Sequence, residues 1–369
     1  MDRFSRRQFL SSSSIAVAAL GAGVAVPSVG WAEEKKGMRT LGRTGLEVTQ
    51  ISFGGLDIGT SALLQGAIDN GINLIHVGTG YVNGKAIRMY GEVMKERRKD
   101  VVLALKEDPI NGIDEALKLL NTDHVDILMP GLHSVEEISN PELPGAFEKL
   151  KKEGKIRFTG FAVHKNIPEV LEKAIELGFY DVMMPSYHTG NRDQVDPLLA
   201  KAKKEHNMGF MAMKPLRGVK KEGKNSTPEE VKAIYADLLK NPQVDSLVIG
   251  MGSFNDLNTN IEACFQKYSQ AMPESVKEMI RYAEAHECAS CGTCSKVCPY
   301  GVAACDIMGM EYYVERGDPA LAAAAYRKLS AAQQADSCRD CGECQAACPK
   351  HLDIPARIRQ THNTVATFA

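Results

Sequence analysis

Residues 72–106 read INLIHVGTGYVNGKAIRMYGEVMKERRKDVVLALK, and this stretch decides the fold. Two short apolar runs, at 72–77 and 101–106, enclose a segment over 85–96 in which apolar residues recur at helical spacing. Runs of five or six apolar residues are typical of buried strands, and the longer amphipathic segment is typical of a surface helix. The stretch therefore predicts a strand, a helix and a second strand.

The same alternation repeats along most of the chain. Apolar runs occur at 50–54, 72–77, 101–106, 125–130, 156–163, 181–185, 209–214 and 246–250, and helical patterns at 62–70, 85–96, 113–120, 141–153, 168–177, 194–205, 228–239 and 254–264. Eight such pairs indicate a (β/α)8 TIM barrel. A doubly wound open sheet is the alternative, but no GxGxxG follows the first strand.

Near the C-terminus the pattern CxxCxxCxxxCP occurs twice, as CASCGTCSKVCP from Cys288 and as CRDCGECQAACP from Cys338. In two-cluster ferredoxins with this spacing, the fourth cysteine of each motif ligates the other cluster. We therefore expect two 4Fe-4S clusters in a small bacterial-ferredoxin-like domain of helices and loops. One would be held by Cys288, Cys291, Cys294 and Cys348, and the other by Cys338, Cys341, Cys344 and Cys298.

Disulfides and zinc are the competing uses of these thiols. Disulfides between cysteines three residues apart would close strained loops, and zinc sites usually present two separated pairs. Cys264 and Cys305 lie outside both motifs and are expected to act as small buried apolar residues. The segment 304–333 between the motifs is predicted to be a helical scaffold, with Asp318 and Pro319 starting its second helix.

The N-terminus has the features of an export signal. Residues 1–32 combine a basic start that contains Arg6 and Arg7, an apolar segment over 15–26, and small residues that lead to Ala32. This predicts a twin-arginine signal peptide, with an uncleaved anchor as the alternative. Proteins exported by that translocase cross the membrane folded, so we expect clusters inserted in the cytoplasm and a periplasmic product. The remaining boundaries are a barrel at 38–268, a connecting helix at 269–285 and an iron-sulfur domain at 286–369.

The composition is that of an ordinary globular protein. Charged residues make up 24% of the chain, and its formal net charge is -2. A nucleic-acid-binding protein usually carries a strong basic excess, so no nucleic-acid partner is expected.

Several segments resemble the aldo-keto reductase family. They are MRTLGRTGLEVTQISFGG, GINLIHVGTGYVNGKAIRMYGEVM, EGKIRFTGFAVH, MKPLRG and LVIGMGSFNDLNTNIE, and the tail CPKHLDIPARI resembles the ferredoxin-type extension of one branch of that family. In that branch the first motif usually has its last cysteine one residue closer. The full spacing found here favours two clusters over one.

The resemblance implies carbonyl reduction by NAD(P)H, with a tyrosine acid supported by Lys, Asp and His. Tyr81 and Lys106 match the family's Tyr and Lys. His76 stands where the family has Asp, and the family's His is displaced to His133. These four are the candidate catalytic residues.

The family's cofactor contacts are largely replaced. Ala162 and Val163 stand for a Ser-Asn pair, Met184 for Gln, and Met213 for a stacking aromatic residue. Only the residues that contact the phosphate and the adenine of the cofactor match the family. They are Gly250, Gly252, Ser253 and Asn260. Loss of the carboxamide's partners argues against nicotinamide binding, as does export.

We expect instead a basic, histidine-rich mouth formed by His76, His133, His164, His188, Lys106, Lys165, Lys214 and Arg217. It could bind a small anionic or carbonyl substrate, or a further metal ion. The favoured function is an exported iron-sulfur oxidoreductase that exchanges electrons with a protein or quinone. The alternatives are an NAD(P)H-dependent aldo-keto reductase that also carries clusters, and an electron carrier with a non-catalytic barrel.

Overall fold

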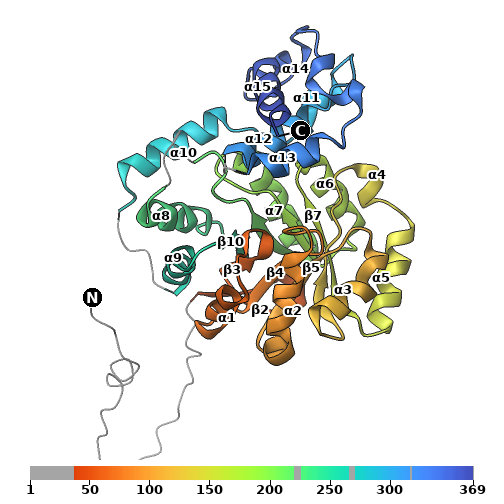
Figure 1. Ribbon diagram of the computed structural model, residues 1–369, viewed down its shortest axis with the longest axis vertical. Coiled ribbons are helices and arrows are strands. Elements are labelled where there is room, and N and C mark those ends of the chain that lie inside the picture. Colours follow the sequence, from red (N-terminus) through yellow and green to blue (C-terminus); the bar gives the residue numbers. More distant parts are fainter. Residues whose placement is uncertain (1–36, 220–225, 266–270, 316–317, 369) are drawn as a thin grey trace, which may run out of the picture. The chain divides into compact units, whose positions relative to one another are not determined.

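The computed structural model describes residues 37–219, 226–265, 271–315 and 318–368. The predicted signal peptide lies outside these residues. The central element is a closed barrel of eight parallel strands, in the order β10-β3-β4-β5-β6-β7-β8-β9 (Figure 1). The predicted (β/α)8 fold is confirmed. The strands are β3 (Ile51–Gly54), β4 (Leu74–Gly78), β5 (Val102–Lys106), β6 (Val125–Leu128), β7 (Ile156–Val163), β8 (Val182–Pro185), β9 (Gly209–Met213) and β10 (Ser246–Gly250).

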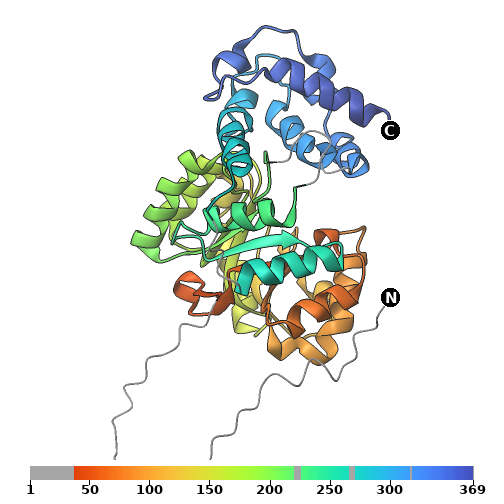
Figure 2. The ribbon, with the colours of Figure 1, turned by 90° about the vertical axis from the view of Figure 1, so that its left-hand side faces the viewer.

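The helices surround the strands, as Figures 1 and 2 show from two directions. They are α1 (Ser61–Asp69), α2 (Lys85–Arg97), α3 (Ile113–Leu120), α5 (Glu142–Lys152), α6 (Ile167–Leu177), α7 (Arg192–His206), α8 (Pro228–Leu238) and α9 (Phe254–Phe265), with the short α4 (Val135–Ile138) before α5. Local signals set their ends. Thr227 and Glu230 form a capping box at the start of α8, and Gly178 ends α6 in the left-handed conformation, with φ 61°.

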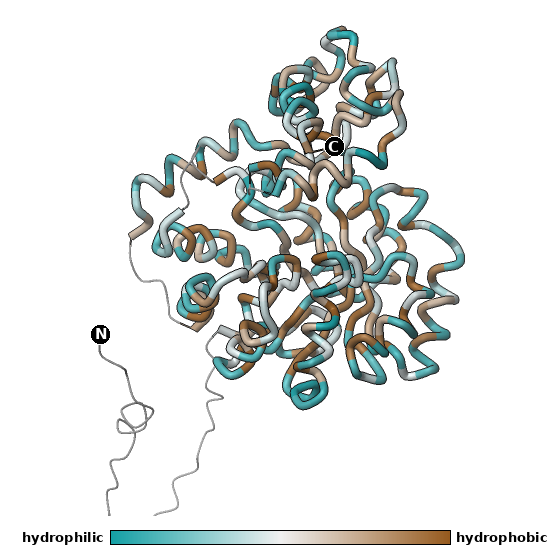
Figure 3. The backbone as a smooth tube through the Cα atoms, in the orientation of Figure 1, coloured by the Kyte–Doolittle hydropathy of each residue, from teal (hydrophilic) through white to brown (hydrophobic). Residues whose placement is uncertain are grey.

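Alternate residues of each strand form two separate cores. Those that point into the barrel, such as Leu74, Ala104 and Met211, form one buried cluster, and their neighbours pack against the helices. Figure 3 shows the hydrophobic strands at the centre and the more hydrophilic outer turns of the helices. An antiparallel hairpin of β1 (Met38–Thr40) and β2 (Glu47–Thr49) precedes the barrel. This hairpin, which the sequence pattern did not indicate, adds Leu41 and Val48 to the interior cluster.

The C-terminal region consists of helices with a core of their own. It contains α10 (Glu274–His286), α11 (Thr293–Lys296), α12 (Ala304–Glu315), α13 (Pro319–Tyr326), α14 (Glu343–Ala346) and α15 (Ile354–Ala366). Short 3-10 helices complete the described chain: η1 (Gly42–Thr44), η2 (Gly55–Asp57), η3 (Arg98–Asp100), η4 (Ile110–Gly112), η5 (Ala331–Gln333) and η6 (Ala335–Ser337). Among the described residues, no helix has the length and apolar character that a membrane span requires.

The two cysteine motifs adopt the same backbone conformation. Gly292 and Gly342 have φ of 83° and 80°, and each begins a short helix, α11 or α14. Two residues earlier, Ser290 and Asp340 also have positive φ, at 56° and 51°. The sequence repeat is therefore a structural repeat, in which tight turns place successive cysteines on the inside of a loop.

Candidate functional site

A cavity of about 1070 Å³ lies at the carboxyl ends of the barrel strands. Catalytic groups of TIM barrels occupy this end because the inward-pointing residues at the strand ends converge there. Alternation along β4 and β5 turns His76 and Lys106 inward, with Leu74 and Ala104 below them. The lining residues that matter for chemistry are His76, Tyr81, Lys106, His133, His164, Met184, Met213, Lys214, Arg217, Tyr312 and Tyr313.

Lys106 is supported by a carboxylate that sequence analysis missed. Its ammonium forms an ion pair with Asp108, two residues along the chain, and Asp108 also accepts a hydrogen bond from the backbone N–H of Gly131. A Cβ atom on Gly131 would lie 3.1 Å from Lys106 Nζ and 3.2 Å from His133 Nε2. Because Gly131 has no side chain, Lys106, Asp108 and His133 can approach one another. His76 stands where the family has an aspartate, and Asp108 provides a carboxylate beside Lys106 instead.

The histidines of the cavity are neutral. Burial lowers the pKa of His76 to about 3 and that of His133 to about 4, and it lowers the pKa of His164 well below its ordinary value. His133 Nδ1 accepts a hydrogen bond from the His164 backbone N–H at 3.3 Å, which leaves the ring proton on Nε2. Positive charge in the cavity therefore comes from lysine and arginine, not from imidazole.

The predicted histidine-rich mouth is only partly present. His188 is fully buried outside the lining of this cavity, and Lys165 forms an ion pair with Asp306 of α12. Among the described residues, no three His, Cys, Asp or Glu side chains converge closely enough to hold a single metal ion, so the cavity histidines do not form a mononuclear metal site. Lys214 and Arg217 do line the cavity. Lys214 Nζ lies 4.6 Å from the ring centroid of Tyr312 and 4.7 Å from that of Tyr313.

Tyr81 lies in the loop after β4, half-buried at the cavity, with its ring 5.9 Å from that of His76. Burial raises the pKa of its hydroxyl, and the nearby groups Tyr313, Asp108 and Asp57 raise it further. In the described residues the ammonium of Lys106 pairs with Asp108, not with Tyr81. Tyr81 is therefore held in its protonated form, as a proton donor must be.

Burial of neutral His76 makes a pH-dependent contribution to stability. Its pKa is about 3 in the folded protein and about 6.5 when unfolded, so the unfolded state binds more protons as pH falls below about 6.5. We expect the free energy of unfolding to fall by about 2 kcal/mol more in the native protein than in His76→Asn between pH 7 and pH 5. Denaturant titrations at the two pH values measure this difference. An identical pH dependence in both proteins would show that folding does not lower the pKa of His76.

The residues at the predicted nicotinamide positions are buried and apolar. Ala162 and Met184 belong to the interior core, and Met184 and Met213 line the cavity. Val163 faces the surrounding helices instead. A nicotinamide carboxamide would therefore meet methyl and thioether groups and not hydrogen-bond partners.

The predicted phosphate site at the start of α9 is occupied by carboxylates. Asp256 accepts hydrogen bonds from the backbone N–H groups of Gly252 and Ser253, at 3.2 and 3.0 Å. A Cβ on Gly250 would lie 1.9 Å from Asp57 Oδ2, so a second carboxylate lies against that glycine. Ser253 and Asp256 form a capping box here, and the sequence SFND carries its signature, so an anion at these N–H groups would have to displace the Asp256 carboxylate.

Asn260, the predicted adenine contact, lies one helical turn after Asp256. It is buried within α9, its amide donates to the backbone carbonyl of Asp256 at 2.8 Å, and it does not line the cavity. Its amide nitrogen therefore supports the helix, while its side-chain oxygen is buried without a hydrogen-bond partner among the described residues.

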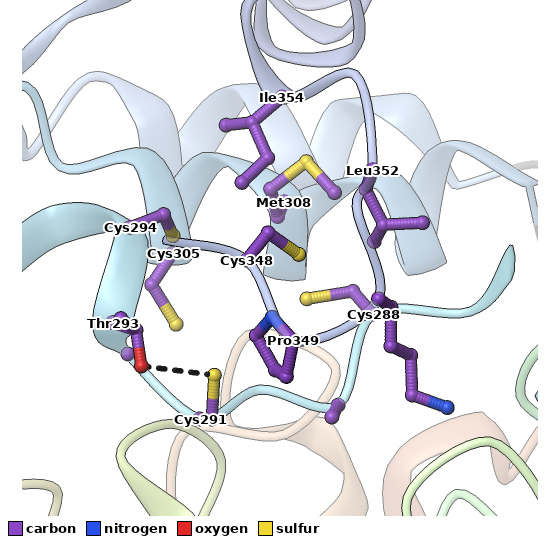
Figure 4. A pocket seen from close by; sticks show the side chains of 13 residues that line it. Cys288, Cys291, Thr293, Cys294, Cys305, Met308, Cys348, Pro349, Leu352 and Ile354 are labelled. Atoms are coloured by element: carbon purple, nitrogen blue, oxygen red, sulfur yellow. Dashed lines mark hydrogen bonds between the residues drawn. The ribbon is translucent and has the colours of Figure 1, made fainter. Parts of the chain in front are cut away.

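The cysteines line two cavities in the crosswise arrangement. The first cavity is lined by Cys288, Cys291 and Cys294 of the first motif and by Cys348 of the second. Figure 4 shows these sulfurs directed toward the same space. The second cavity is lined by Cys338, Cys341 and Cys344 of the second motif and by Cys298 of the first.

All ten cysteines are among the described residues, and none forms a disulfide. Four thiols of the two motifs lie around each cavity, and the fourth of each set is followed by proline, which matches the ligand set of a 4Fe-4S cluster. The first set is also the more enclosed: Cys294 and Cys348 are buried, whereas Cys341 of the second set is exposed.

Two features of the segment between the motifs differ from the sequence prediction. Cys305 is buried as expected, but it lines the first cavity, and its side chain interacts with Cys294. Helix α12 is more than a scaffold, because Met308 lines the first cavity while Tyr312 and Tyr313 line the barrel cavity. The helical spacing of these residues was visible in the sequence, but the two cavities that they join were not.

Comparison with known proteins agrees with both parts of this description. Residues 59–237 match the aldo/keto reductase family, and residues 284–352 match the 4Fe-4S dicluster domain. An uncharacterized oxidoreductase of Bacillus subtilis, YqkF, is 27% identical over 203 residues, which cover 48% of this chain and 64% of that protein. The L-galactose dehydrogenase of Arabidopsis thaliana is 26% identical over 292 residues, which cover 64% of this chain and 91% of that protein.

Among solved structures, an aldo-keto reductase from Klebsiella pneumoniae in complex with NADPH superposes with a TM-score of 0.54. It is 19% identical, and the match covers 69% of this chain and 97% of that one, a level of identity that shows the fold alone. The two family matches fall on the barrel and on the cysteine motifs. The chain is therefore an oxidoreductase built from an aldo/keto reductase domain and a 4Fe-4S dicluster domain.

Proposed function

We propose that this protein is an exported oxidoreductase in which two 4Fe-4S clusters, and not a bound nicotinamide, deliver electrons to a small carbonyl substrate in the barrel cavity. One observation carries the proposal: α12 contributes to both sites. Met308 lines the first cysteine cavity, and Tyr312, four residues along the helix, lines the barrel cavity. Four residues of α-helix rise about 6 Å, so the two cavities are about one helical turn apart along α12.

The donor sets support two clusters. One would be held by Cys288, Cys291, Cys294 and Cys348, and the other by Cys298, Cys338, Cys341 and Cys344, as their positions around the two cavities suggest. When bound, each 4Fe-4S cluster supplies one electron at a time.

Neither end of the barrel cavity suits NAD(P)H. The cofactor's phosphates would face Asp57 and Asp256, whose negative charges oppose phosphate binding, and the N–H groups that could bind phosphate already donate to Asp256. At the other end, Met184 and Met213 offer the carboxamide no hydrogen bond. The electrons must therefore enter from another part of the protein.

The barrel residues support the reduction of a carbonyl to an alcohol. That conversion consumes two electrons and two protons. Tyr81 donates one proton to the carbonyl oxygen, and solvent provides the second proton. Lys106 and the Nε2–H of His133 stabilise negative charge that develops on that oxygen, and Asp108 fixes the position of Lys106. Lys106 and Lys214 also favour a substrate that carries a carboxylate or another anionic group.

A one-electron donor, either a redox protein or a quinol, would supply the electrons from outside. We propose a periplasmic location and export by the twin-arginine translocase, on the strength of the sequence of residues 1–32 alone. Export of the folded protein would protect clusters that were inserted in the cytoplasm. It would also remove the protein from the cellular pool of nicotinamides, in keeping with the acidic groups at the start of α9.

NADPH titration tests the proposal. We expect no saturable binding of NADPH up to about 1 mM. A dissociation constant of about 1 mM corresponds to a binding free energy of only about -4.1 kcal/mol. If the carboxylates are the cause, the Asp57→Asn/Asp256→Asn double variant should bind NADPH at least tenfold more tightly than the native protein. Glu262→Gln, on the same helix but paired with Lys232, is the matched control and should not change binding. Low-micromolar binding to the native protein, with hydride transfer to a carbonyl, would overturn the proposal.

A further inference from the structure

The residue that precedes the first cysteine motif packs against loops at the carboxyl end of the barrel. Glu287, next to Cys288, is buried against two barrel glycines that follow β8 and β9. A Cβ on Gly190 or on Gly218 would lie only 2.7 Å from a side-chain carbon of Glu287. The absence of side chains at these two positions therefore leaves the space that Glu287 occupies.

Arg217, in the loop after β9, holds Glu287 there. Its guanidinium is 2% exposed and donates from Nε to Glu287 Oε1 at 2.5 Å. The other two nitrogens donate to Ser290 Oγ at 3.1 Å and to the backbone carbonyl of Met308 at 3.3 Å. Ser290 lies between Cys288 and Cys291, and Met308 lines the first cysteine cavity. Arg217 itself lines the barrel cavity, so one buried cation contacts the walls of both sites.

The second cysteine cavity has no comparable link. Within the described residues, Cys338 to Cys348 make no hydrogen bond or ion pair with the barrel. The cations close to this cavity are on the surface: Arg339 lines it, and Arg359, which pairs with Asp340, is 46% exposed. Water and salt screen such charges strongly, whereas a buried charge acts at low effective dielectric.

We infer that the first cluster, held by Cys288, Cys291, Cys294 and Cys348, exchanges electrons with the barrel substrate. Arg217 raises the reduction potential of this cluster. Electrons enter the protein through the second cluster, which is more exposed. This inference rests on the proposed function. Arg217 is a positioning residue, because its N–H groups orient Glu287, Ser290 and the start of the first motif. Reduction adds one negative charge to a cluster, so a buried cation nearby favours the reduced form. The negative charge of Glu287 lowers the reduction potential of the same cluster. Glu287 accepts a hydrogen bond from Arg217, so the two charges partly offset each other.

A redox titration followed by electron paramagnetic resonance tests the inference on the intact, anaerobically prepared protein. Arg217→Gln should lower the midpoint potential of one cluster only, by about 59 mV, which is a tenfold change in the equilibrium of a one-electron couple. Arg217→Lys keeps the charge and should restore most of the potential. Arg359→Gln, which removes an exposed cation beside Asp340 in the second motif, is the matched control and should leave both potentials within about 15 mV of their native values.

Arg217→Gln leaves the Glu287 carboxylate buried without its partner, and the variant can fail to fold for that reason. Glu287→Gln provides the independent test, because removal of a negative charge next to Cys288 should raise the potential of the same cluster. The inference is overturned if Arg217→Gln and Glu287→Gln shift different clusters, or if they shift neither. Loss of that signal in Cys348→Ala identifies the cluster.

These outcomes separate the inference from the proposed function. A native protein that shows no cluster signal at all contradicts the proposed function. Two cluster signals that do not respond to Arg217 or Glu287 contradict only the inference about which cluster adjoins the barrel.

Discussion

Replacement of Cys348 by alanine is expected to remove one of two clusters and to leave about four iron atoms per chain in place of about eight. The reason is the crosswise arrangement, in which Cys348 of the second motif lines the cavity of the first. Cys305 provides a further thiol in the same cavity, so the comparison is made in a Cys305→Ala background. Iron and acid-labile sulfide analysis of anaerobically purified protein measures the loss.

Double variants distinguish the crosswise arrangement from one in which each motif holds its own cluster. Cys291→Ala/Cys348→Ala removes two thiols from one cavity, so about four iron atoms should remain. Cys291→Ala/Cys298→Ala removes one thiol from each cavity and should remove both clusters. If each motif held a separate cluster, the results of these two double variants would be exchanged.

Replacement of Tyr81 by phenylalanine is expected to slow carbonyl reduction by a factor of about 10² to 10⁴, the usual contribution of a positioned proton donor. Burial raises the pKa of the Tyr81 hydroxyl and keeps its proton in place, and Tyr81 lines the barrel cavity. Iron content and cluster potentials should not change, because Tyr81 lies outside both cysteine cavities. The measurement is the rate at which a carbonyl reoxidises the reduced protein.

Tyr282→Phe is the control for that experiment, since Tyr282 is exposed on α10 and lines neither the barrel cavity nor the cysteine cavities. Equal rates in Tyr81→Phe and in the native protein would show that Tyr81 is not the acid. A loss of clusters in Tyr81→Phe would show instead that the substitution acts through the structure.

The fold could be predicted because its signals are local and repeated. Each strand is a short apolar run and each helix carries its own periodicity, so eight strand-helix pairs sufficed to indicate the barrel. The hairpin of β1 and β2 was missed because three-residue strands such as Met38–Thr40 carry no clear pattern. The cysteine spacing likewise placed eight thiols without knowledge of their surroundings.

The chemical environment of the site was harder to predict because it depends on contacts between distant segments. Asp108 is two residues from Lys106 in the sequence. Only the fold shows that both side chains lie together with His133 around Gly131. The role of Glu287 depends on Gly190 and Gly218, which are about 70 to 100 residues away. By contrast, the capping box of Ser253 and Asp256 is a local feature that the sequence SFND indicates by itself.

The most direct test of the account is an anaerobic single-turnover experiment without nicotinamide. Purified protein is reduced by a one-electron donor, freed of excess donor, and mixed with a small α-keto acid or dialdehyde while the cluster absorbance is recorded. The account predicts that the carbonyl reoxidises the clusters at a rate that depends on its concentration, with one alcohol formed for every two electrons. Reduced clusters that persist in the presence of carbonyls, together with carbonyl reduction that starts only when NADPH is added, would contradict it.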